Sequence, residues 1–242
     1  MRLAILSVSL IFIGCGSSFE IQKSMTENKY SLAYLHDSKP ISEKNKYSVY
    51  IDSIEVVKNI GDTLRVRQKG VFVLPLLVLN IWNINYECDF GNNVLQENNI
   101  RFIKNSFVAE ANRSGSFNVS TDSINADYRL KIKIAENDCM GPYNQNGFFY
   151  FALYAYGYSV SEKAGPGKSS IKWLYSLRKG NSYIVYDSIN SSKIGSSIRP
   201  ITQNYAQLRK DFGNSLAESL SGTYKECIEK TISSINDKLK QF

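Results

Sequence analysis

The sequence predicts an α+β fold with a mostly antiparallel sheet, one mid-chain helix, and a long C-terminal helix packed on one face of the sheet. Two observations support this prediction. Segments with strand character form a group of three before the first helical segment and a group of five after it. From about residue 200 to the end, the chain has a sustained helical pattern. Segregated strands and helices favour this class over an alternating parallel α/β arrangement.

The N-terminal residues have the pattern of an export signal. Arg2 supplies a positive charge, and an apolar run follows from Leu3 to Ile13. This run is too short for a membrane-spanning helix, which needs about 20 apolar residues. It has the size of a signal-peptide core, and the small residue Gly14 follows it. We therefore expect residues 1–14 to be a cleaved signal peptide.

The tetrapeptide at residues 12–15, Phe12-Ile13-Gly14-Cys15, resembles the bacterial lipobox. The lipobox usually has Leu where this chain has Phe12. The resemblance implies that Cys15 is lipidated on its sulfur and becomes the mature N-terminus. Two or three acyl chains hold a protein on a membrane far more firmly than the marginal attachment of a single chain. The resemblance thus implies an exported lipoprotein of a bacterial cell envelope, with the outer membrane as the expected site.

Residues 15–46 are polar and lack a sustained period, so we expect a lipidated N-terminus followed by a tether. His36 and Asp37 fall in this segment and are expected to face solvent. From residue 47 the pattern changes, and residues 47–242 are expected to form one α+β domain.

The first three strand-like segments contain the first of two apolar stretches. Residues 47–57 alternate, a turn is expected at 59–62, and residues 64–67 alternate again. Residues 71–82 then contain no charge. Because Pro75 has no N–H to donate, a central strand through it is not expected. A strand that bends at Pro75 and an apolar loop both fit.

The mid-chain helix is expected to begin at Asn93, which can act as an N-cap with Gln96 three residues later. Apolar residues from Ile100 to Ala111 then recur at spacings of three and four, and Gly115 suits the helix end.

The second group of strands and the last helix have the clearest patterns. Residues 128–134 alternate between apolar and basic side chains, which indicates one buried and one wet face. Residues 148–158 are rich in aromatics, and residues 178–181 suit a hairpin turn. An apolar stripe runs from Tyr205 to Leu239, with Gly213 and Gly222 as points where the helix could bend or divide.

Three cysteines remain after Cys15. Cys88 and Cys139 each close a strand-like run, and disulfides persist outside the cytoplasm. We therefore predict a Cys88–Cys139 bridge, with Cys227 as a small buried apolar residue. A metal site built from Cys88, Asp89, Asp138 and Cys139 is a weaker alternative, because it matches no paired-cysteine zinc pattern. No metal and no cofactor are expected.

The sequence gives little sign of catalysis. With one histidine in 242 residues, a two-histidine metal site is excluded and a triad is disfavoured. The segment 164–169 resembles the end of a phosphate-binding loop but lies between two strands, and position 162 is Glu rather than Gly. A carboxylate pair remains as a hydrolase hypothesis, with candidates at strand ends: Glu87, Asp89, Glu136 and Asp138.

The apolar stretches 71–82 and 148–158 are open to two interpretations. Both could be core strands, or parts of them could form an exposed surface that binds a protein or a membrane. The candidate residues of such an interaction surface are Phe72, Leu74, Leu76, Trp82, Tyr154, Tyr156 and Tyr158.

The order of elements after a lipobox is similar to that of small periplasmic lipoproteins of transport-auxiliary and envelope-assembly systems. This resemblance implies a non-enzymatic accessory protein that is attached to a membrane and binds an envelope partner. The alternatives are a lipoprotein that carries a hydrophobic ligand and an envelope hydrolase. Net charge is +7 without a cluster of Lys and Arg, so nucleic acid is not an expected partner.

Overall fold

A computed structural model describes residues 18–41, 44, 46–76, 78–152, 154–199 and 204–241. The expected signal peptide and Cys15 lie outside the described residues. The elements in chain order are β1 (Ser48–Val56), β2 (Arg65–Pro75), β3 (Leu79–Asp89), the 3-10 turn η1 (Asn92–Val94), α2 (Asn99–Ser114), β4 (Asn118–Ser120), β5 (Tyr128–Ala152), β6 (Ala155–Ala164), β7 (Lys168–Lys179), β8 (Ser182–Ile194) and α3 (Tyr205–Leu239). A further helix covers residues 18–26.

The predicted α+β class is confirmed, with three strands, a helix, five strands and a long helix in the expected order. The strands form one eight-stranded sheet around the 25-residue strand β5. Its pairings are antiparallel except for those of β1 with β4 and β5.

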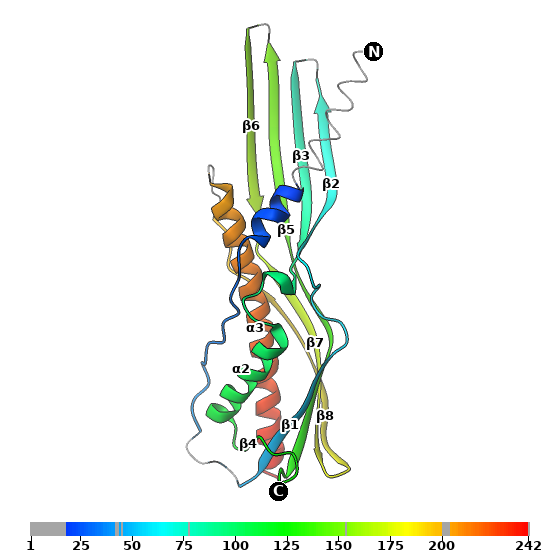
Figure 1. Ribbon diagram of the computed structural model, residues 1–242, viewed down its shortest axis with the longest axis vertical. Coiled ribbons are helices and arrows are strands. Elements are labelled where there is room, and N and C mark those ends of the chain that lie inside the picture. The colour runs from blue at the N-terminus through cyan, green and yellow to red at the C-terminus, as the bar shows by residue number, and fades with distance from the viewer. Residues whose placement is uncertain are drawn as a thin grey trace.

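Strand β5 divides the sheet into two parts along its length. Its first half lies between β1 and β7, and its second half lies between β3 and β6. Helices α2 and α3 lie along the first part (Figure 1). The second part is a four-stranded antiparallel sheet, and its hairpins β2–β3 and β5–β6 project together beyond the helices (Figure 1).

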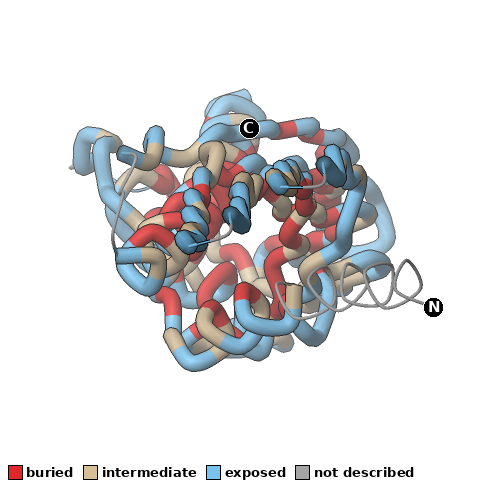
Figure 2. The backbone as a smooth tube through the Cα atoms, turned by 90° about the horizontal axis from the view of Figure 1, so that it is seen from above, coloured by how far each residue is buried: buried red, intermediate tan, exposed pale blue. Residues whose placement is uncertain are grey.

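Helix α3 covers the sheet through the predicted apolar stripe. Its buried residues include Phe212, Leu216, Leu220, Ile228 and Ile235. They face Leu130, Ile132, Trp173 and other buried residues of the same core. Seen down the long axis, buried backbone lies inside an exposed outer layer (Figure 2). Gly213 and Gly222 do not divide the helix, which is continuous over 35 residues.

The prediction of a polar tether is wrong for residues 18–41. Ile21, Met25 and Tyr30 are fully or almost fully buried in the domain core. The chain after Tyr30 is held along α2 and α3, for example by the backbone amide of Ala33, which donates to Ser221 Oγ at 3.1 Å. The buried apolar residues of this segment lack a period, and others, such as Phe19 and Leu35, remain exposed.

The N-cap of α2 lies five residues later than predicted, because Asn98 takes this position and its side chain accepts from the amide of Ile100. Asn93 instead lies in η1, and its Oδ1 accepts from the amide of Leu64 at 2.8 Å. Gly115 follows the helix as predicted.

The predicted Cys88–Cys139 bridge is absent, because Cys88, Cys139 and Cys227 are free and buried. Cys88 pairs with Gly141 and Cys139 with Ser169, so the two cysteines are diagonal on adjacent strands. Diagonal Cβ atoms are about 7 Å apart, which is well beyond the roughly 4 Å of a disulfide. The Sγ of Cys139 lies 3.4 Å from the carbonyl of Leu216 on α3.

Candidate functional site

The two uncharged stretches of the sequence form the two projecting hairpins. Residues 70–86 and 139–161 contain no charged side chain. Residues 71–75 lie in β2 and residues 79–82 in β3, whereas residues 148–152 lie in β5 and residues 155–158 in β6. Pro75 ends β2, a strand that pairs on one side only, where the missing N–H removes no ladder hydrogen bond.

The interpretation of these stretches as core strands is wrong, because most of their large apolar side chains are exposed. We call this set the hairpin surface: Val71, Phe72, Leu74, Leu76, Val78, Ile81, Phe148, Phe149, Tyr150, Phe151, Tyr154, Tyr156 and Tyr158. Six of the seven candidate interaction residues are in this set. The seventh, Trp82, is half-buried. Monomeric soluble proteins rarely expose a contiguous apolar patch of this kind.

The hairpin surface covers both faces of the four-stranded sheet. Ile81 pairs with Leu74 and Phe148, so these three side chains lie on one face. Phe149 pairs with Tyr158 on the opposite face, because successive residues of a strand alternate. The projecting sheet is therefore apolar on both sides, whereas nearer the domain the second face packs into the core through Ile84 and Tyr86.

A polar band ends the hairpin surface on the outer face. Asn144 Nδ2 donates to Asn83 Oδ1 at 2.6 Å and to Asn85 Oδ1 at 2.7 Å. At the edge of this band an open groove of about 600 Å³ is lined by apolar residues including Phe72 and Ile81 and by Asn146. The change from apolar to amide side chains occurs within two residues along β3, from Ile81 to Asn83.

Glycines shape the hairpins where aromatic rings cross the backbone. Trp82 pairs with Gly147, where an added Cβ would lie 2.1 Å from the indole ring. Tyr150 pairs with Gly157, where an added Cβ would lie 2.3 Å from the phenol ring. These aromatic–glycine pairs are a signal that sequence reasoning missed.

A buried ion pair fixes the base of the β5–β6 hairpin to α3. Arg209 Nη2 donates to Glu162 Oε1 at 2.7 Å, and both side chains are largely buried. The hydroxyl of Tyr143 also donates to Glu162. Burial, together with the neighbouring Glu162 charge, raises the pKa of Tyr143 above its usual range, so that this hydroxyl keeps its proton. The hairpins therefore start from a rigid base.

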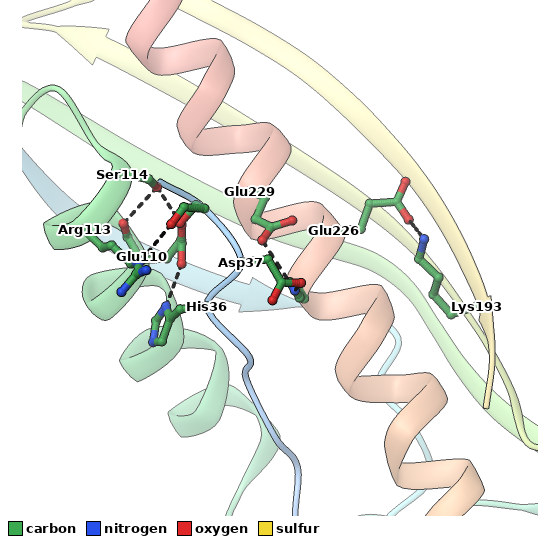
Figure 3. Close-up of polar contacts among 10 residues, drawn as sticks. His36, Asp37, Glu110, Arg113, Ser114, Lys193, Glu226 and Glu229 are labelled. Carbon is green, nitrogen blue, oxygen red and sulfur yellow. Dashed lines mark hydrogen bonds and ion pairs between the residues drawn. The ribbon is translucent and has the colours of Figure 1, made fainter. Parts of the chain in front are cut away.

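A second polar cluster, which the sequence did not predict, lies between the N-terminal segment and α2 (Figure 3). The buried carboxylate of Glu110 lies 2.7 Å from His36 Nδ1 and accepts from Ser114 Oγ at 2.7 Å and from Ser38 Oγ. Burial acts to raise the pKa of Glu110, but these hydrogen bonds outweigh it and hold the pKa below its usual value. His36 and Asp37 are exposed as residues, yet His36 binds Glu110 and Asp37 pairs with Lys225. The cluster fastens the segment to the domain.

Three of the four carboxylates of the hydrolase hypothesis, Glu87, Asp89 and Asp138, are held in ion pairs with basic side chains on the sheet. Arg67 Nη2 lies 2.8 Å from both Glu87 and Asp89, and Lys58 pairs with Asp138. Within the part of the chain that the structure describes, no group of three or more His, Cys, Asp or Glu side chains could hold a metal ion.

The loop that resembles a phosphate-binding segment is occupied by internal contacts. It connects β6 to β7, and the amide of Gly167 donates to Ser215 Oγ on α3 at 2.9 Å. An added Cβ at Gly167 would lie 2.6 Å from the backbone of Leu216, so the loop is packed against the helix. Among the described residues, no helix is long and apolar enough to span a bilayer.

Comparisons with known proteins give only weak structural similarities. No family model matches the chain, and no curated protein does. The crystal structure of XCC0632 from Xanthomonas campestris, of family DUF330, is similar at 11% identity and a TM-score of 0.46, over 88% of this chain and 99% of that one. A neuraminyllactose-binding hemagglutinin homologue from Helicobacter pylori is similar at 13% identity and a TM-score of 0.31, over 84% and 99%. Neither similarity supports an inference about function.

Proposed function

We propose that this protein is a non-enzymatic lipoprotein of a bacterial envelope, anchored by acyl chains on Cys15, which acts in binding or assembly through the hairpin surface. The observation that carries the proposal is that thirteen large apolar side chains among the described residues are exposed on two neighbouring hairpins, within segments 70–86 and 139–161 that contain no charged residue. Leaving so much apolar surface in water costs solubility, and it is typical of interaction sites.

The fold supports a role in binding more than one in ligand carriage or hydrolysis. A ligand carrier would be favoured by a closed apolar cavity, but the groove beside Phe72 and Phe148 is open. A hydrolase would be favoured by carboxylates that meet in a cleft, but Glu87, Asp89 and Asp138 are occupied by ion pairs on the surface of the sheet. The rigid base at Glu162 and Arg209 suits hairpins that hold a fixed shape toward a target.

Site-specific photocrosslinking in living cells tests this function. A photoreactive amino acid replaces Tyr156 on the hairpin surface or, as the matched control, Tyr186 on β8; the two tyrosines are 73% and 71% exposed. We expect reproducible crosslinks from position 156 to an envelope protein or lipid, and far fewer from position 186. Equal and diffuse crosslinking from both positions would contradict a role for the hairpin surface in binding.

A second arm tests the anchor. With an alkyne fatty acid added to the culture, the wild-type protein should carry the label and remain with membranes, whereas Cys15→Ala should lose both. Absence of label from the wild type would contradict lipidation without affecting the crosslinking result.

A further inference from the structure

We infer that the hairpin surface inserts into one leaflet of a lipid bilayer, at the boundary between headgroups and acyl chains. The inference rests on the proposed function and deepens it, because it names lipid as the material that the hairpin surface binds. A second copy of this chain and a protein partner are the competing occupants.

Apolar side chains on both faces favour lipid over a protein partner. A sheet that docks on a protein buries one face or one edge and keeps the other in water. Here Phe148 and Tyr150 lie on one face, while Phe151 and Tyr156 lie on the other, and all are exposed. A fluid apolar medium surrounds an inserted object on all sides, so it satisfies both faces at once.

The kinds of side chain match the depth of a membrane interface. Tyrosine is enriched where hydrocarbon meets water, because its ring is apolar and its hydroxyl binds water or headgroups. Tyr150, Tyr154, Tyr156 and Tyr158 are all on the β5–β6 hairpin, whereas Leu74, Leu76 and Val78 are on the β2–β3 hairpin. The band of Asn83, Asn85 and Asn144 lies nearer the domain than the hairpin surface, on the side that stays in water.

The described N-terminal segment begins near the base of the hairpins, three residues after the proposed acyl anchor at Cys15. The carbonyl of Glu20 lies 3.4 Å from Arg209 Nη1, in the same cluster that binds Glu162 at the base of β6. The helix at 18–26 lies at the base of the hairpins, and α3 runs from there toward the opposite end (Figure 1). Covalent geometry keeps Cys15 within about 11 Å of Ser18.

The hairpins are long enough to contact the bilayer in which the proposed acyl chains on Cys15 would insert. From Tyr143, beside Arg209, to Ala152 at the end of β5, the strand extends by roughly 30 Å. The hairpin ends thus extend farther from this base than Cys15 can. Acyl chains on Cys15 that enter a bilayer bring the hairpin surface against it. The far end of α3 is roughly 50 Å away along the helix.

Open sheet edges limit the depth of insertion. Strands β2 and β6 each pair on one side only, so their outer backbone groups have no partner strand. In the hydrocarbon core, where no water is present, such unpaired backbone groups are strongly unfavourable. At the headgroup boundary water still reaches them, and side chains enter by about 5–10 Å. The inference is therefore shallow insertion in one leaflet.

Vesicle binding by the unacylated protein tests the inference. The protein is residues 15–242 with Cys15→Ser, which removes any acyl contribution, and the vesicles contain phosphatidylethanolamine and phosphatidylglycerol. We expect the protein to float with the vesicles. The double variant Phe151→Ser/Tyr156→Ser should lower its partition coefficient by at least about tenfold, because both side chains would otherwise be buried in the interface. These two residues face each other across β5 and β6.

The matched control is Tyr183→Ser/Tyr186→Ser, which removes two exposed tyrosines from β8 on the domain body. It should leave vesicle binding unchanged. Thermal unfolding of each variant checks that the fold is kept. If the first double variant unfolds early, Leu74→Ser/Leu76→Ser on the other hairpin replaces it. A fluorophore on Phe151→Cys should be quenched more strongly by a quencher near the headgroup than by one near the end of the acyl chain.

Two results would overturn the inference. Failure to float, with dimers or larger species in sedimentation, assigns the hairpin surface to a second copy. Failure to float, with a monomer in sedimentation, leaves only a protein partner. The proposed function would survive either result if position 156 still gives crosslinks in cells, so the two failures can be distinguished.

Discussion

At the scale of single residues, close packing contacts explain why particular positions, such as glycines inside a helix, carry the residue that they do. Gly213 on α3 is one example, because an added Cβ would lie 2.1 Å from the ring of Tyr30. This contact lets the N-terminal segment lie against the helix, and it explains why a poor helix former occurs inside α3. At Gly222, by contrast, an added Cβ would lie 3.3 Å from Cγ of the flexible Lys193 side chain.

These two glycines give a matched pair of substitutions. Alanine gains about 1 kcal/mol over glycine inside a helix. At Gly222→Ala we expect stability to be unchanged or raised by up to about 1 kcal/mol. At Gly213→Ala the clash with Tyr30 should dominate and destabilise the fold by about 1–3 kcal/mol. Urea unfolding measures the free energy of unfolding of both variants. Equal effects of the two substitutions would show that Tyr30 does not pack on α3.

The three buried thiols give a second prediction at this scale. Burial raises the pKa of Cys139 and of Cys227 to about 12, so the reactive thiolate is scarce at pH 8. In residues 15–242 with Cys15→Ser, an alkylating reagent should add no label to the folded protein and three labels in denaturant without reductant. A single label in denaturant would reveal a disulfide and contradict the free thiols.

The Glu110 cluster makes stability depend on pH. Its folded-state pKa lies below the usual 4.5, so its stabilising contribution is present above pH 4.5 and is lost as the pH falls through the lower folded-state pKa. Glu110→Gln should lower stability at pH 7 by about 1–3 kcal/mol, because it removes the charge that His36, Ser38 and Ser114 bind. The difference between wild type and variant should shrink toward pH 3. A difference that is constant with pH would contradict the role of the charged form.

At the scale of elements, the sequence correctly predicted the helices and strands that bury one face, because such elements have a regular pattern of apolar residues. The apolar stripe of α3 and the alternation of residues 128–134 both arise from a single packed side, and the structure has both. The start of α2 was missed because Asn93 and Asn98 are both good caps, and tertiary contact with Leu64 decides between them. The burial of Tyr30 was missed because an extended segment can pack without any period.

The hairpins show that sequence pattern also fails to identify an exposed apolar strand. A strand that is apolar on both faces has the sequence of a buried core strand, so residues 148–158 could not be placed inside or outside by pattern alone. Only the pairing of β5 with both β3 and β6, beyond the ends of α2 and α3, shows that nothing in the chain described here covers them.

At the scale of the whole molecule, the part covered by α2 and α3 and the projecting hairpins lie at opposite ends of the long axis (Figure 1), and the hairpins carry the exposed apolar side chains. Helix α3 and the sheet form the core, and the ion pair between Arg209 and Glu162 joins this core to the hairpins. The helix at residues 18–26 lies beside the same junction, which connects the proposed anchor at Cys15 to the hairpin surface. The described chain thus begins, at Ser18, near the base of the hairpins that carry the apolar surface.

The most direct test of this account is thiol labelling in intact envelopes. Tyr156→Cys on the hairpin surface and Tyr186→Cys on the domain body are compared by reaction with a membrane-impermeant maleimide, before and after detergent. The native cysteines are buried and contribute little. The account predicts that position 156 is protected in the envelope and reacts after detergent, whereas position 186 reacts equally in both. Rapid labelling of position 156 in the intact envelope, at the rate of position 186, would contradict it.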